Sequence, residues 1–294
     1  MISIVNIYTA VIYGYYLFFI GLIAYLYWHY SKSYEPEKLY NYTNTIPAKL
    51  SPIELSILVN NKITPQALTA TVYFLVANKA LIKSKEKKEI YLYRNLNYKG
   101  KLSHSQKYVI KLLIDIIGNG ERVAFTNIEK FCVNNKGATS FLLNYEIWRR
   151  MAISEGSKKN FFEPKKHKHL VNWFSVIGLV LFLINILFSL KTFLGYFLLL
   201  PALFILYYYR KIFRRTKKYN EQFYQWLEFS SYLKNIKQLG FEKENIHLYL
   251  MYSIVLDKIE YVEPHLLKSE EFVKLNSYIK KSYKRAYFHG SRSL

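Results

Sequence analysis

The chain has 294 residues and carries 42 Lys and Arg against 20 Asp and Glu, for a formal net charge of +22. Its one cysteine, Cys132, excludes an intramolecular disulfide. Two long stretches almost without charge exclude a wholly soluble protein, because about 20 apolar helical residues suffice to cross a bilayer. We therefore expect an α-rich integral membrane protein with three transmembrane helices.

The first span is expected at the amino terminus, because residues 1–28 contain no Asp, Glu, Lys or Arg. A cleaved secretion signal would need a basic start, a short apolar core and small residues at the cleavage site. The segment has none of these features, which favours an uncleaved anchor. Lys32 is the first cation after the span, so the amino terminus is expected to lie outside the cell.

A polar linker over 29–49 leads into a soluble region over 50–169. Ser51, Pro52 and Glu54 predict a capped helix start, and Thr64-Pro65 predicts a second helix that ends near Asn78. Residues 80–83 and 89–93 then alternate apolar and polar side chains around a charged tip over 84–88, which indicates a β-hairpin. Helix, helix and hairpin in this order predict a winged-helix-like α+β module.

Residues 103–152 resemble this pattern in part. We expect a helix over 103–117, a short strand over 123–125, a helix capped by Thr126 and a longer helix that ends near Ala152. The region is therefore interpreted as one winged-helix-like module or two such units. Asp115 is expected to face water rather than to serve as a buried acid, and Cys132 to be a small core residue.

The second charge-poor stretch predicts two more spans, over 170–190 and 193–209, joined by a turn at Lys191 and Thr192. Both flanks are basic, so both are expected to be cytosolic. Residues 29–169 carry 24 Lys and Arg against 11 Asp and Glu, and residues 210–294 carry 17 against 9. The positive charge therefore lies almost wholly in segments assigned to the cytosol.

We call the cations that flank this hairpin the basic collar and expect them to contact anionic lipid or phosphate. They are Lys165, Lys166, Lys168, Arg210, Lys211, Arg214, Arg215, Lys217 and Lys218. His167 and His169 flank Lys168 and are assigned to the collar rather than to a metal site. In the hairpin, Lys83, Lys85, Lys87 and Lys88 are candidate wing contacts to phosphate.

Residues 210–294 are expected to form a cytosolic helical module with a basic tail. Trp226 and Phe229 lie on its first apolar helix, and together with Tyr73 and Phe74 they are candidates for an exposed docking face or, at helical spacing, for core. The tail from Lys274 is expected either to lie on the membrane, with Ile279, Tyr283 and Tyr287 towards lipid, or to be disordered.

Several segments resemble the uncharacterised prokaryotic membrane proteins grouped as domain of unknown function 2207. In the first soluble region the resemblance rests on Leu50-Ser51-Pro52-Ile53-Glu54 and on Leu75-Val76-Ala77 leading into Leu81-Ile82. In the second it rests on Trp226-Leu227-Glu228-Phe229, Tyr232-Leu233 and the run from Tyr249 to Leu256. The resemblance extends from the first span to about Tyr261 and supports the same architecture.

The chain also departs from that family. The family's typical glycines correspond here to Ser56, Lys79 and Asp257, and its proline to Met251. The resemblance implies a shortened relative that lacks the family's extracytoplasmic β-rich domain. It implies no established activity.

No glycine-rich phosphate loop, His-Glu-x-x-His motif or pair of cysteines is present in the sequence. We therefore expect a protein without enzymatic activity, cofactor or metal. The favoured hypothesis is a membrane-anchored scaffold or adaptor in the cell membrane whose cytosolic modules bind a protein partner and whose collar contacts anionic lipid. The alternative is a membrane-tethered winged-helix regulator that binds nucleic acid. The second helix, however, offers only Gln66 and Asn78 to base edges.

Overall fold

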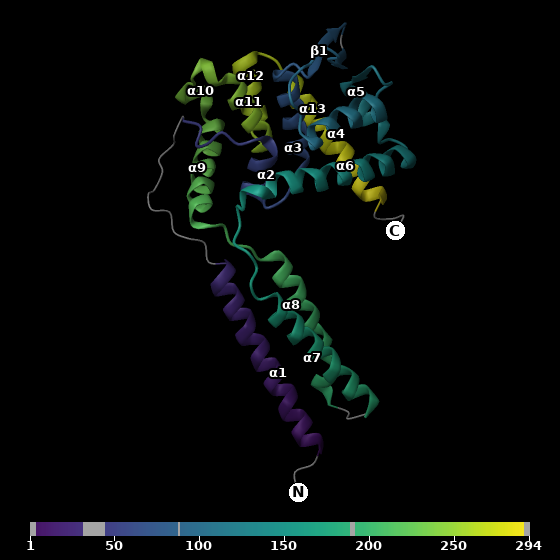
Figure 1. Cartoon of the computed structure of the whole chain (residues 1–294), viewed down its shortest axis with the longest axis vertical. Helices are drawn as coiled ribbons and strands as arrows, with labels where there is room; N and C mark the ends of the chain where they lie inside the picture. The colour runs from purple at the N-terminus through teal and green to yellow at the C-terminus, as the bar shows by residue number, and fades with distance from the viewer. Residues whose placement is uncertain (1–3, 32–44, 88, 189–191, 291–294) are drawn as a thin grey trace. The chain divides into compact units, whose positions relative to one another are not determined.

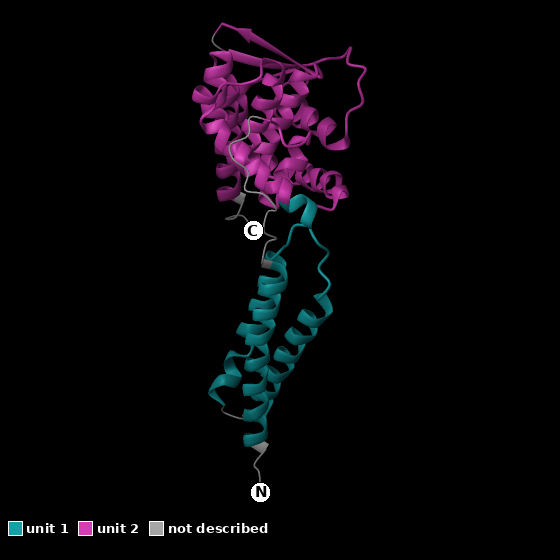
Figure 2. Ribbon diagram, turned by 90° about the vertical axis from the view of Figure 1, so that its left-hand side faces the viewer, with its two compact units in different colours: residues 1–36, 162–220 teal, residues 37–161, 221–294 magenta. Residues whose placement is uncertain are grey.

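Figure 1 shows the computed structural model of the chain, which describes residues 4–31, 45–87, 89–188 and 192–290. Two compact units are present (Figure 2). Unit 1 holds residues 1–36 and 162–220, and unit 2 holds residues 37–161 and 221–294. Unit 2 is therefore discontinuous in sequence, and the segment inserted into it belongs to unit 1.

Unit 1 contains the three helices that are long and apolar enough to cross a membrane among the described residues. These candidate spans are Val5–Tyr30, Lys168–Leu187 and Phe193–Lys211, and they coincide with the three segments predicted from the sequence. Lys191 of the predicted turn lies outside the described residues. The elements of unit 1 are α1 (Ile4–Leu26), the π-helical turn η1 (Tyr27–Ser31), α7 (Lys168–Leu187), η4 (Phe193–Phe197) and α8 (Leu199–Lys211).

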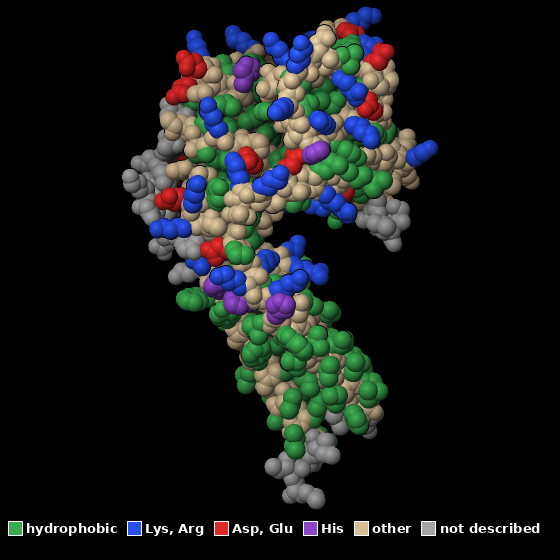
Figure 3. All heavy atoms as spheres, viewed as in Figure 1, with side chains coloured by type: hydrophobic (Ala, Val, Ile, Leu, Met, Phe, Trp, Pro, Cys, Tyr) green, Lys and Arg blue, Asp and Glu red, His purple; other side chains and the backbone are tan. Residues whose placement is uncertain are grey.

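The helices of unit 1 pack through aromatic and small side chains. The rings of Tyr15 on α1 and Phe174 on α7 stack with centroids 4.4 Å apart. A Cβ atom added at Gly178 would lie 2.1 Å from the Tyr15 hydroxyl, so only glycine allows this approach. On the face that Figure 3 shows, hydrophobic side chains predominate along the three helices, while Lys, Arg and His gather at the end that holds η1 and the start of α7.

Unit 2 consists of helices and one sheet, which has the order β1-β2-β3 in the described part of the chain and antiparallel pairing throughout. The first segment contributes α2 (Pro52–Asn60), α3 (Pro65–Ala77), β1 (Leu81–Glu86), β2 (Glu89–Arg94), α4 (His104–Ile110), η2 (Lys111–Ile117), β3 (Arg122–Ala124), α5 (Phe125–Phe131), α6 (Asn135–Gly156) and η3 (Ser157–Lys159). The second contributes α9 (Lys217–Lys234), which begins in unit 1, then α10 (Ile236–Leu239), η5 (Lys243–Asn245), α11 (Ile246–Val255), α12 (Ile259–Leu267) and α13 (Glu271–Gly290).

The predicted starts of α2 and α3 are confirmed, although their caps differ. Ser51 and Glu54 form a full capping box at α2, whereas the Thr64 side chain makes no capping hydrogen bond at α3. Thr126 was predicted to cap a helix and does not, because Ala124 is the N-cap of α5. Instead, the Thr126 hydroxyl donates to Glu89 at 2.8 Å and ties α5 to β2. The hairpin tip is also shorter than predicted, since residues 84–86 belong to β1.

Helices α3 and α11 of unit 2 are each followed by a non-glycine residue in the left-handed region. Lys79 after α3 has φ 61°, and Asp257 after α11 has φ 57°. In each case the next residue closes the turn, since the Ala80 amide donates to the Leu75 carbonyl at 2.8 Å and Lys258 to Ser253 at 2.7 Å. Glycine favours such helix ends because a Cβ atom disfavours positive φ.

The core of unit 2 joins the two segments that flank the hairpin. Helix α13 packs against α3, α5 and α6, and α11 packs against α3. The Thr69 hydroxyl on α3 donates to the Asn276 amide oxygen on α13 at 3.1 Å, across 207 residues of sequence. The two soluble segments therefore pack together into one core.

The carboxy-terminal helix corrects one sequence-based expectation. Ile279 on α13 is fully buried, and the Ser282 hydroxyl nearby donates to the Ile128 carbonyl at 2.9 Å. The ring of Tyr283 contacts that of Tyr145 on α6 in a tilted arrangement, with centroids 4.8 Å apart. Only Tyr287, at 61% exposure, remains on the surface. The described tail is thus an ordered core helix, because its apolar face is covered by α3, α5 and α6.

Candidate functional site

The basic collar separates into cations that hold unit 1 together and cations that face outward. Lys165 belongs to the first group. Its ammonium donates to the carbonyl of Arg210 at 3.0 Å and lies 5.2 Å from the centre of the Tyr209 ring. The Arg210 carbonyl lies in the last turn of α8, where the helix dipole favours a positive charge. Partial burial lowers the pKa of the Lys165 ammonium, because desolvation disfavours the charged form.

Arg214 and Arg215 also serve the structure of unit 1. Arg214 donates to the His29 carbonyl at 3.1 Å, and its own carbonyl accepts from the Glu163 amide at 2.9 Å. Arg215 lies over the Phe162 ring at 5.8 Å, and these two residues also form a β-bridge. These contacts pair the segment before α7 with the segment after α8 through one isolated bridge, and Arg214 joins them to η1 at the end of α1.

The remaining collar cations are exposed, and they are Lys166, Lys168, Arg210, Lys211, Lys217 and Lys218. Lys211 lies over the Tyr207 ring at 5.5 Å and Lys218 over the Tyr219 ring at 5.5 Å. Aromatic rings with cations beyond them are typical of a membrane–water interface. The exposed cations therefore remain the candidates for contact with lipid phosphate, while Lys165, Arg214 and Arg215 make contacts within the protein.

An aromatic and histidine cluster lies at the same end of unit 1. The Tyr25 hydroxyl is 3.1 Å from His167 Nε2, and the rings of His29 and His167 lie edge to face at 5.3 Å. No three His, Cys, Asp or Glu side chains are grouped as metal ligands anywhere in the described ranges. His167 therefore packs within this aromatic cluster at the end of α1.

The wing lysines are less available than the sequence suggested. Lys83 forms an ion pair with Glu271 at the start of α13 and lies 5.7 Å from the Phe272 ring. Lys85 lines a polar pocket of about 330 Å³ together with side chains of α5 and α13. Lys87 is exposed, and Lys88 lies outside the described residues. Lys83 is therefore removed from the predicted phosphate contacts, because α13 supplies it with a counter-ion.

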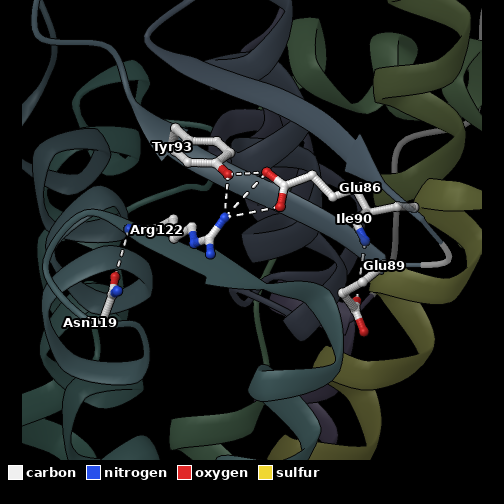
Figure 4. A network of polar contacts seen from close by, with 6 residues as sticks. All are labelled: Glu86, Glu89, Ile90, Tyr93, Asn119 and Arg122. Carbon is white, nitrogen blue, oxygen red and sulfur yellow. Dashed lines mark hydrogen bonds and ion pairs between the residues drawn. The ribbon is translucent and has the colours of Figure 1, made fainter.

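The outer face of the sheet carries a polar and aromatic network that the sequence analysis missed (Figure 4). Arg122 on β3 donates to the Glu86 carboxylate at 3.1 Å and to the Tyr93 hydroxyl at 2.7 Å. Its guanidinium also lies 4.5 Å from the centre of the Tyr91 ring. The hydrogen bond from Tyr93 is the main cause of the lowered pKa of Glu86, and Arg122 adds to it.

Ile82 extends this network along the sheet and is 48% exposed. It pairs with Tyr93, which in turn pairs with Arg122, so the three side chains lie in a row across the three strands. We call Ile82, Tyr91, Tyr93 and Arg122 the sheet face. The alternation of side chains in the hairpin sequence predicts that Tyr91 and Tyr93 share one face of the sheet. It does not reveal that β3 adds Arg122 to that face.

The predicted docking face is wrong for three of its four members. Tyr73 is 5% exposed, and Trp226 and Phe229 are fully buried. The rings of Trp226 and Tyr252 meet at 4.7 Å, because α9 and α11 form part of the core. Phe74 is half-buried and lines a pocket of about 150 Å³ with Thr71, Ser103 and Glu155. These residues therefore stabilise unit 2 rather than present a surface.

The Glu155 carboxylate, which lines the pocket beside Phe74, already accepts hydrogen bonds from the protein. Glu155 accepts hydrogen bonds from the Ser105 amide and the Ser103 hydroxyl, both at 2.9 Å. Burial opposes its ionisation, but the hydrogen bonds from Ser105 and Ser103 outweigh burial and lower its pKa. Asp115 is likewise paired, since it accepts from Arg94 at 2.8 Å on the surface, in agreement with the expectation that it faces water.

Packing of other helices around α3 hinders its insertion into a DNA groove. Eight of the thirteen residues of α3 are buried, among them Thr69 and Thr71. A recognition helix must expose one side to base edges, whereas α3 is covered by α2, α11 and α13. Entry of α3 into a DNA groove would therefore require removal of packed helices.

The chain was compared with known proteins. Residues 39–258 match the family model described as predicted membrane protein, domain of unknown function 2207, C-terminal domain. No curated protein and no solved structure matches. The matched range includes α7 and α8 and most of unit 2. With its three apolar helices, the chain is a membrane protein and belongs to this family of predicted membrane proteins.

Proposed function

We propose that the protein is a non-enzymatic membrane-anchored scaffold that presents unit 2 to a protein partner. One observation carries this proposal: unit 2 is built from the two segments that flank the α7–α8 hairpin. Segments that share one core must lie on the same side of the membrane. Unit 2 is thus tethered by the chain on both sides of the hairpin, and such a tether restrains a binding module near the bilayer.

The exposed collar supports a cytosolic location for this module. Lys166, Lys168, Arg210 and Lys211 lie at the end of the hairpin from which the chain continues into unit 2. Short basic segments next to a span are retained in the cytosol, and anionic lipids of the inner leaflet attract them. The proposed orientation therefore places the amino terminus outside and the carboxy terminus inside.

The sheet face is the proposed partner-binding surface. Tyr and Arg are the residues that most often dominate protein interfaces, and rigid side chains lose little entropy on binding. Tyr91, Tyr93 and Arg122 are held by mutual contacts, and Ile82 adds an exposed apolar side chain beside them. A partner with an apolar side chain and an acidic group would complement this surface.

The test is co-purification from native membranes after gentle detergent extraction, with wild type, Ile82→Glu and Leu96→Glu compared. Leu96 is 87% exposed and follows the hairpin, so it provides a matched apolar-to-acid control. We expect Ile82→Glu to lose a partner that both wild type and Leu96→Glu retain. Equal recovery with all three proteins would exclude the sheet face as the docking surface.

A further inference from the structure

A groove runs between α7 and α8 within the proposed membrane-spanning part of unit 1. It has a volume of about 390 Å³, in the range of sites that hold a small ligand. The Ser175 hydroxyl donates to the Ala202 carbonyl at 3.1 Å, so the helices approach closely here and these small residues form the floor. Its lining consists of Asn172, Ser175, Val176, Leu179, Leu199, Ala202, Leu203 and Leu206.

The helical repeat extends both walls of the groove to a cation. On α7, Lys168 lies four residues before Asn172 and therefore on the same face. On α8, Arg210 lies four residues after Leu206, again on the same face. Both side chains are exposed, and within the described ranges neither has an ion-pair partner. The groove therefore ends between two available positive charges.

We propose that this groove binds one anionic phospholipid. An acyl chain lies along Val176, Leu179 and Leu203, and the phosphate binds Lys168 and Arg210. Arg is suited to the phosphate because its planar guanidinium forms paired hydrogen bonds. From Lys168 to Leu179 the helix rises by roughly 16 Å, at about 1.5 Å per residue. This length matches one leaflet, which is half of a hydrocarbon core of about 30 Å.

Asn172 supports this assignment. Its side chain is exposed and lies one turn from Lys168 towards the bilayer centre. An amide without a hydrogen-bond partner is costly in hydrocarbon. The ester oxygens of a phospholipid lie just below its phosphate, so they would accept from the Asn172 amide. A purely apolar occupant, such as a helix of a second copy, offers no such acceptor.

The site depends on the membrane setting of the proposed function but not on partner binding at the sheet face. Its test is native mass spectrometry of the detergent-purified full-length chain, titrated with phosphatidylglycerol or with zwitterionic phosphatidylcholine. We expect one phosphatidylglycerol to bind with preference over phosphatidylcholine. Lys168→Ala and Arg210→Ala should each raise the half-saturating concentration by roughly fivefold, the effect of one juxtamembrane cation.

Two matched controls separate a defined site from general attraction. Lys211→Ala removes a neighbouring collar charge from α8 that lies beside the groove rather than at its end, so it should weaken this binding less than Arg210→Ala does. Val176→Phe should block the groove, whereas Ile177→Phe, at an equally exposed position outside it, should not. The proposal is overturned if Lys211→Ala weakens lipid binding as much as Arg210→Ala does, or if Val176→Phe retains the lipid. It is also overturned if Val176→Phe abolishes a dimer of the chain, because a second copy would then be the occupant of the groove.

Discussion

Replacement of Ile279 by alanine tests whether the carboxy-terminal helix belongs to the core of unit 2. Ile279 is fully buried, and removal of a buried isoleucine side chain to Cβ costs about 2–5 kcal/mol of unfolding free energy. With a urea dependence of about 2 kcal/mol per M, the unfolding midpoint should fall by roughly 1–2.5 M. If α13 instead lay on lipid, the stability of unit 2 would hardly change.

The assay is urea unfolding of the detergent-solubilised chain, followed by tryptophan fluorescence. Trp28 and Trp173, each 67% exposed, are replaced by Phe so that Trp148 and Trp226, both fully buried in unit 2, report the transition. Tyr287→Ala on the exposed face of α13 is the control and should change the unfolding free energy by less than about 0.5 kcal/mol. Equal midpoints for Ile279→Ala and Tyr287→Ala would refute the packing described for α13.

Three further predictions concern unit 2. Lys79→Gly should raise the unfolding free energy by about 1 kcal/mol because it relieves a left-handed residue, whereas Asn78→Gly, at φ −86°, should lower it; equal effects in urea melts would contradict this. Burial raises the pKa of Cys132 to about 11, against about 8.5 in the unfolded chain. The buried thiol therefore contributes its full stabilisation below about pH 8.5, and this contribution to the unfolding free energy declines as the pH rises from about 8.5 to about 11. Maleimide should label Cys132 slowly at about pH 7 unless urea is added. Glu155→Gln should cost about 1 kcal/mol at pH 7, and since the folded pKa of Glu155 is lowered, this loss should vanish as acid protonates the wild-type carboxylate; a pH-independent difference would contradict it.

The local features of the fold were predictable because their signals lie close together in sequence. Ser51 and Glu54 define one capping box, and the alternation around β1 and β2 defines the hairpin. The three spans follow from the absence of charge over stretches longer than a bilayer requires. Each of these features depends on residues within one element or on its immediate neighbour.

The functional surfaces were less predictable because their partners are distant in sequence. The apolar face around Trp226 was equally compatible with a surface or a core until Tyr252 was found to cover it. Likewise, Lys83 was taken as a free cation, yet Glu271 pairs with it from 188 residues away. Periodicity reports which side of an element is apolar, but it does not report which other element covers that side.

The central claim is that both segments of unit 2 lie in the cytosol. Cysteine accessibility in intact cells tests it most directly, in a Cys132→Ala background with single substitutions Leu96→Cys and Tyr287→Cys, both at exposed positions. We predict that a membrane-impermeant maleimide labels neither position until the cells are permeabilised, and that it then labels both. Labelling of either cysteine in intact cells would contradict the proposed orientation, and labelling of only one would also contradict the shared core.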